Sequence, residues 1–274
     1  MRNTITRRRG MRMRYKSGNY TSRFLQDLQD FPEAPSIISE GDSWFAYPFG
    51  RDLNDWIVRS GNFNIRRLEK AGDELIDDMM DGRQKKLLTR AFKRHQFELL
   101  LYSGGGNDIV AENLENYICD DESGYGPHNR IDEAAITARM AELSAHYVEL
   151  IELVAKYQNN CPIIAHGYDN IIPSDEGFRI FGVQLAGPWV KPTLDRKGIK
   201  PEHQAEVINF IMGLFNDILI KLADKYDKFY YIDLRGTLTK KSDWANEIHP
   251  TSRGFGKLAV HYTDLVKQLV PSAF

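Results

Sequence analysis

The residues best suited to chemistry begin with a serine at the end of an apolar run. Ser43 closes the segment Gly41-Asp42-Ser43, soon after Ile37 and Ile38. A serine hydroxyl becomes a useful nucleophile only where a base accepts its proton and hydrogen-bond donors stabilise the oxyanion that forms. Candidates for both tasks follow along the chain, namely Gly72, the segment Gly105-Gly106-Asn107-Asp108 and the segment Glu247-Ile248-His249-Pro250.

The order of these segments resembles that of the SGNH hydrolases, also called the GDSL esterase/lipase family, over about residues 36–265. The family carries its serine in Gly-Asp-Ser, then a glycine after the second strand, then Gly-x-Asn-Asp and finally Asp-x-x-His. The matching positions here are Ser43, Gly72, Asn107 and His249. The last block departs from the pattern, because position 246 is Asn where the family has Asp.

The resemblance implies a serine hydrolase that cleaves a carboxylic ester or thioester through an acyl-enzyme and needs no cofactor. Ser43 would be the nucleophile, and His249 the base that takes its proton and returns it to the leaving alcohol. The backbone N–H groups of Ser43 and Gly72 and the side-chain amide of Asn107 would form the oxyanion hole. We expect Ser43 at a strand-to-helix corner, where helix amides favour negative charge.

The group that orients His249 is open at this stage. The amide oxygen of Asn246 can accept the imidazole N–H and fix its tautomer, although it carries no full negative charge. Asp243, Glu247 or a backbone carbonyl could serve instead, and Glu247 is disfavoured because adjacent side chains in a loop diverge. We favour a Ser–His dyad oriented by Asn246 or by a backbone carbonyl. The alternative is a binding or scaffold protein on the same frame with weakened catalysis, and Asn246 is the residue that favours it.

Four further residues are candidates for lining a substrate pocket, because they follow the nucleophile or the fourth apolar run: Trp44, His166, Tyr168 and Asp169. The run Gly104-Gly105-Gly106 lacks the Gly-Lys-Ser/Thr ending of a phosphate-binding loop. No group of histidines and carboxylates has metal-ligand spacing in the sequence, so we expect no metal and no other cofactor.

Five short apolar runs predict buried parallel strands, at residues 36–40, 62–66, 97–102, 162–166 and 229–233. Helical stretches alternate with them, at residues 51–60, 73–81, 84–94, 132–158, 203–226 and 252–269. This alternation predicts a three-layer α/β/α sandwich with a five-stranded parallel sheet, the flavodoxin-like fold of SGNH hydrolases. The candidate residues then meet at one sheet edge, where such folds place their sites.

We expect a single domain over residues 31–274, preceded by a flexible leader at residues 1–30. Two long connections, near residues 109–131 and 170–201, are insertions at the functional edge and are expected to shape the pocket. Of the 274 residues, the first 24 carry a net charge of +8 without an acidic residue, whereas the remainder carries −10.

The basic leader lacks the apolar stretch of a secretory signal, and no run suits a membrane span. Binding of the leader to nucleic acid or to an anionic surface is a lesser alternative to a solvated tail. The two cysteines, Cys119 and Cys161, have no disulfide or metal spacing, so a cytoplasmic location is expected. The expected partner is a small-molecule ester, and the sequence leaves the oligomeric state undecided.

Overall fold

A computed structural model describes residues 20–119, 127–180 and 183–274. Its main sheet has five parallel strands in the order β2-β1-β3-β4-β7. They are β1 (Ser36–Gly41), β2 (Asn64–Arg67), β3 (Leu99–Ser103), β4 (Ile163–His166) and β7 (Phe229–Ile232). The prediction of a five-stranded parallel α/β sheet is confirmed, and each strand lies within two residues of its predicted ends.

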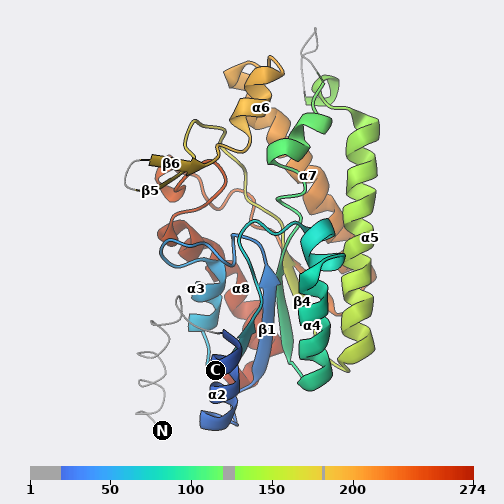
Figure 1. The fold of residues 1–274 in the computed structure, drawn as a ribbon, viewed down its shortest axis with the longest axis vertical. Helices are drawn as coiled ribbons and strands as arrows, with labels where there is room; N and C mark the ends of the chain where they lie inside the picture. Colours follow the sequence, from blue (N-terminus) through green and yellow to red (C-terminus); the bar gives the residue numbers. More distant parts are fainter. Residues whose placement is uncertain (1–19, 120–126, 181–182) are drawn as a thin grey trace.

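The α-helices of the described residues are α2 (Tyr20–Asp30), α3 (Leu53–Arg59), α4 (Arg83–Arg94), α5 (Glu133–Tyr157), α6 (Lys191–Arg196), α7 (Pro201–Lys225) and α8 (Ser252–Leu269). Helices α3 and α8 pack together on one side of the sheet, whereas α4, α5 and α7 cover the other (Figure 1). A short π-helix, η2 (Leu75–Met80), replaces the helix predicted over residues 73–81. The described ranges also contain the 3-10 helices η3 (Ala111–Asn116), η4 (Pro127–Arg130), η5 (Lys241–Asp243) and η6 (Pro271–Ala273).

Burial on both faces explains the apolar residues of the strands at the centre of the sheet. All five residues of β3 are buried, which is typical of a central parallel strand covered by helices on both sides. Side-chain caps fix where several helices begin. Asp52 forms a capping box with Asp55 before α3, and Thr251 accepts a hydrogen bond from the Gly254 N–H before α8.

The structure differs from the expected leader at residues 20–30. These residues form α2, which packs against β2 and buries Phe24 to 1% exposure. The apolar face of α2 consists of few residues among many polar ones, so the sequence gives only a weak helical pattern of apolar residues there. Residues 1–19, which hold most of the basic charge of the leader, lie outside the described residues. The expectation that the leader binds an anionic partner concerns these residues and stays a prediction.

The insertion at residues 170–201 contains a two-stranded antiparallel hairpin, β5 (Phe178–Ile180) and β6 (Val183–Ala186), followed by α6. The insertion at residues 109–131 is described except for residues 120–126 and contains η3 and η4. In the part of the chain that the structure describes, no helix is both long and apolar enough to cross a membrane.

Candidate active site

The carboxyl ends of the central strands bring the candidate residues to one edge of the sheet. Ser43 follows β1, Asn107 follows β3 and Tyr168 follows β4. Strands β1 and β3 approach closely where the serine loop begins, because a Cβ atom built at Gly41 would lie 2.7 Å from the Ser103 carbonyl oxygen. Only glycine allows this approach, which sets the position of the turn that carries Ser43.

Ser43, His249 and Asn246 form a continuous hydrogen-bonded chain. The Ser43 Oγ lies 2.7 Å from His249 Nε2, and His249 Nδ1 lies 2.9 Å from Asn246 Oδ1. All three side chains are buried, with exposed fractions of 9% or less. This is the arrangement in which an imidazole can accept the serine proton while its other nitrogen is held by an orienting group.

Backbone donors fix which end of the Asn246 amide faces the imidazole. The same Oδ1 accepts hydrogen bonds from the N–H groups of Ile248, at 3.2 Å, and His249, at 2.9 Å. A flipped amide would point its NH₂ group at these two donors, so the orientation with Oδ1 inward is strongly favoured. Because Oδ1 can only accept, His249 carries its proton on Nδ1 and leaves the Nε2 lone pair free for the serine proton.

The imidazole of His249 is enclosed by aromatic rings as well. Tyr47 stacks on it with ring centroids 5.0 Å apart, and Trp189 meets it edge-on at 5.2 Å. Burial lowers the pKa of His249 to about 3, because the charged imidazolium is poorly solvated there. His249 is therefore neutral, and able to act as a base, over most of the pH range.

The two acidic neighbours of Asn246 are engaged elsewhere. Both carboxylate oxygens of Asp243 lie 2.7 Å from Lys257 Nζ. Glu247 points into the insertion and accepts hydrogen bonds from the N–H groups of Trp189, Val190 and Lys191 at 2.5–2.7 Å, and from Ser174 N–H at 3.2 Å. Among the described residues, Asn246 is the side chain that contacts His249 Nδ1 by a hydrogen bond.

Three groups near the Ser43 turn are the predicted donors of an oxyanion hole. The N–H groups of Ser43 and Gly72 form no hydrogen bond with another described residue. Asn107 donates one amide hydrogen to the carbonyl oxygen of Asp73, at 2.9 Å, which places its side chain beside the Gly72 loop and leaves its second amide hydrogen available. Gly72 has φ +88°, a conformation that favours glycine, so the loop can turn its N–H away from the sheet.

The helix predicted over residues 51–60 is present as α3, but the expectation that its N-terminal amides lie at the Ser43 corner is wrong. Residues 42–46 form a tight turn in which Phe45 and Ala46 donate to the Asp42 carbonyl oxygen, and α3 begins only at Leu53. The N–H groups near Ser43 therefore belong to loops and not to the N-terminus of a helix.

Asp42 and Tyr168 tie three strand ends together. The Asp42 carboxylate accepts hydrogen bonds from the Tyr168 hydroxyl, from Ser103 Oγ at 2.8 Å and from Trp44 N–H at 2.9 Å. The Tyr168 oxygen in turn accepts from Gly106 N–H at 3.1 Å. Burial raises the pKa of Asp42 to about 6, although these donors oppose the shift. The network holds the Ser43 turn against the Asn107 loop.

A small cavity opens beside Ser43, and Trp44 and Tyr168 line it as expected of pocket residues. His166 and Asp169 do not line it. His166 is fully buried behind Trp44 and donates its Nδ1–H to the Gly167 carbonyl oxygen, and burial lowers its pKa to about 4. Asp169 accepts hydrogen bonds from the N–H groups of Gly236 and Leu238, so it braces the loop after β7.

Residues that the sequence analysis did not single out complete this cavity: Val110, Ile171, Met212 and Ile248. Val110 and Ile171 belong to the two insertions, and Met212 comes from α7. Apolar residues are common along the chain, so these four do not stand out in the sequence. The sequence feature that could have indicated them is the position of the two insertions next to the functional edge of the sheet.

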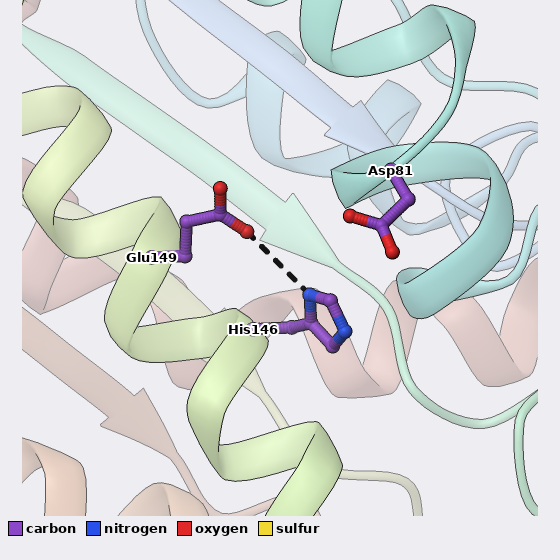
Figure 2. Close-up of side chains that lie close together, drawn as sticks. All are labelled: Asp81, His146 and Glu149. Carbon is purple, nitrogen blue, oxygen red and sulfur yellow. Dashed lines mark ion pairs between the residues drawn. The ribbon is translucent and has the colours of Figure 1, made fainter.

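One group of metal-ligating side chains lies away from this cavity. His146 and Glu149 on α5 face Asp81 at the end of η2, and their ligand atoms all lie within 4.8 Å of one another (Figure 2). Glu149 already pairs with Lys85 and lies 3.6 Å from His146 Nδ1. Of the three side chains, Glu149 is thus already engaged by a lysine.

We expect Glu247→Gln to lower the free energy of unfolding by about 2–3 kcal/mol, because it sets an NH₂ group against backbone donors in a buried site. Urea unfolding monitored by circular dichroism measures the loss. Glu152→Gln, at an exposed position on α5, is the matched control and is expected to be nearly neutral. Equal unfolding midpoints for the two variants would show that the four hydrogen bonds of Glu247 do not stabilise the insertion.

Comparison with solved structures gives the same fold. The extracellular lipase of Streptomyces rimosus, at 16% identity, and a member of the lipolytic protein G-D-S-L family from Veillonella parvula, at 17%, each match with a TM-score of 0.52. The native aryl esterase of M. smegmatis matches at 13% identity with the same TM-score. Each match covers 86% of this chain and 100% of the other chain.

No family model and no curated protein matches the sequence. At these low identities the structural likeness establishes the fold. The chain has the α/β fold of the GDSL/SGNH lipases and esterases, as the order of its motifs predicted.

Proposed function

We propose that this protein is a serine hydrolase that cleaves a carboxylic ester or thioester. The observation that carries the proposal is the chain of hydrogen bonds from Ser43 Oγ through His249 to Asn246, at 2.7 and 2.9 Å. The fold supports it, because the solved structures with this fold include a lipase and an aryl esterase. No step in the mechanism requires a metal or an organic cofactor.

In the first half-reaction Ser43 Oγ attacks the ester carbonyl carbon while its proton moves to His249 Nε2. The carbonyl oxygen becomes an oxyanion that accepts hydrogen bonds from Asn107 Nδ2 and from the N–H groups of Ser43 and Gly72. His249 then donates the proton to the leaving alcohol, the C–O bond breaks and an acyl-enzyme remains. In the second half-reaction water gives its proton to His249, attacks the acyl carbon and releases the acid, and the proton returns to Ser43.

Asn246 acts through His249 as a positioning residue. Its oxygen fixes the tautomer and the plane of the ring, as an aspartate would, but without a negative charge to stabilise the imidazolium. The transition state therefore depends more heavily on the oxyanion donors. The missing negative charge at position 246 is also the feature that favours the second candidate function, a binding protein with the fold of a hydrolase.

A fluorophosphonate probe separates the two candidates, because it reacts with an activated serine and needs no knowledge of the substrate. We expect stoichiometric labelling of the wild type, located on Ser43 by peptide mass spectrometry, and no labelling of Ser43→Ala. Ser60→Ala, a serine at the end of α3, is the control and should label as the wild type does. An unlabelled wild type with an intact fold would overturn the hydrolase proposal and support the binding protein.

A further inference from the structure

The cavity beside Ser43 is narrow and almost wholly apolar. Its apolar walls are the side chains of Trp44, Val110, Ile171, Met212 and Ile248 and the ring of Tyr168, and the polar residues that line it are Asp42, Ser43 and Asn107, beside Gly106. The volume that the centre of a water-sized group can occupy inside it is about 20 Å³, so only a small group fits. A group that enters it must be small and uncharged.

The position of the base decides which part of an ester would enter. His249 must reach the leaving oxygen to protonate it, so the alcohol lies on the side of Ser43 that faces His249. Asn107 takes the carbonyl oxygen. The remaining substituent of the carbonyl carbon is the acyl group, which points toward the cavity, since Ser43 and Asn107 line the cavity and His249 does not.

The walls are held in place by contacts that resist widening. The backbone N–H and C=O groups of Ile171 are both bound by the Asn209 side chain, at 2.7 and 3.0 Å. Tyr168 is held by Asp42 and Gly106, and Val110 and Met212 are each 3% exposed. Extra methylene groups in a close-packed interior force side chains and backbone to shift, which costs free energy. A longer acyl chain would therefore enter this cavity only at such a cost.

From this geometry we infer that the substrate is an ester of a very short acid, with an acetyl group as the acyl group. The inference rests on the proposed hydrolase function and names its substrate class. The alcohol side is not restricted in this way, because it lies outside the cavity. The product acid is then acetate, and Val110, Ile171 and Met212 set the acyl length.

The test compares kcat/KM for p-nitrophenyl acetate, butyrate and octanoate at equal, submicellar concentrations. For the wild type we expect a fall of at least about 100-fold from acetate to octanoate. Met212→Ala and Ile171→Ala enlarge the cavity from two different elements. At least one of them should raise the butyrate-to-acetate ratio by about 10-fold, while Met140→Ala, a buried methionine on α5 away from the cavity, should leave the ratio unchanged.

Octanoate cleaved by the wild type as fast as acetate would overturn the acyl-length inference while leaving the hydrolase proposal intact. Unchanged ratios in both folded cavity variants would also overturn it. If no ester is cleaved and the phosphonate does not label Ser43, the hydrolase proposal itself falls and the acyl inference falls with it. Each variant is checked by circular dichroism and thermal unfolding, so that a loss of fold is not mistaken for a change in specificity.

Discussion

Replacing His249 with alanine is expected to lower kcat/KM for p-nitrophenyl acetate by about 10⁴-fold or more, because Ser43 then has no group to accept its proton. Among the described residues, His249 is the side chain that forms a hydrogen bond with Ser43 Oγ, at 2.7 Å from its Nε2. His261→Ala, which removes an exposed histidine from α8, is the matched control and should keep wild-type activity.

Chemical rescue distinguishes a lost base from a damaged fold. The alanine variant leaves an imidazole-sized space between Tyr47 and Trp189, whose rings contact His249 in the wild type. Added imidazole is therefore expected to restore part of the activity of His249→Ala and none of the activity of Ser43→Ala. Wild-type turnover in a folded His249→Ala protein would show that another group activates the serine.

The second large effect concerns Asn246. Removing its oxygen in Asn246→Ala frees the imidazole to take the wrong tautomer and leaves the N–H groups of Ile248 and His249 unpaired, so we expect kcat to fall by about 100-fold or more. If kcat stays at the wild-type value, Asn246 does not orient the base.

Asn246→Asp tests the same residue by adding a negative charge next to His249, and the pH profile of its activity measures the effect. In the wild type the pKa of His249 is lowered to about 3 by burial, so kcat/KM should hold its plateau down to about pH 4, and protonation of His249 removes activity only below that. An aspartate would favour the imidazolium and raise the pKa of His249. The acidic limb should therefore move up by about one pH unit or more, with kcat at pH 7 maintained or increased. An acidic limb at the same pH in both proteins would show that His249 does not control it.

The sheet could be predicted from the sequence because its central strands, such as β3, are apolar runs between polar segments. The edge strand β2 has one apolar residue, Ile65, among polar ones, so its pattern is the weakest of the five. The nearness of Ser43 and Asn107 followed from the rule that strand ends converge at one edge, whereas the place of His249 before the last helix followed from the order of the motifs. By contrast, the sequence predicts residues 20–30 as part of the flexible leader, although they form α2. The buried face of this helix holds few residues, and the segment that precedes it in the chain is basic.

The details that decide specificity depend on tertiary contacts that no local pattern carries. The cavity walls at Val110 and Ile171 come from insertions whose conformation is fixed by remote partners, such as Asn209 for Ile171. The direction of the Asn246 amide depends on where the N–H groups of the next residues point. The structure also shows that Glu247 is turned away from His249 and toward the insertion, as the divergence of adjacent side chains suggested.

The chain places Ser43 and His249 206 residues apart, and the Trp44 indole N–H donates to the Ile248 carbonyl oxygen across almost the same span. During synthesis at about 5–20 residues per second, the loop around the nucleophile would wait on the order of 10–40 s for its partner to be made. Until then the turn after β1 has neither its base nor the loop on which Trp44 is anchored. Hydrolytic activity in a translation or refolding assay would therefore appear only after the C-terminal part of the domain is made, and a nascent chain that stops before His249 would stay inert.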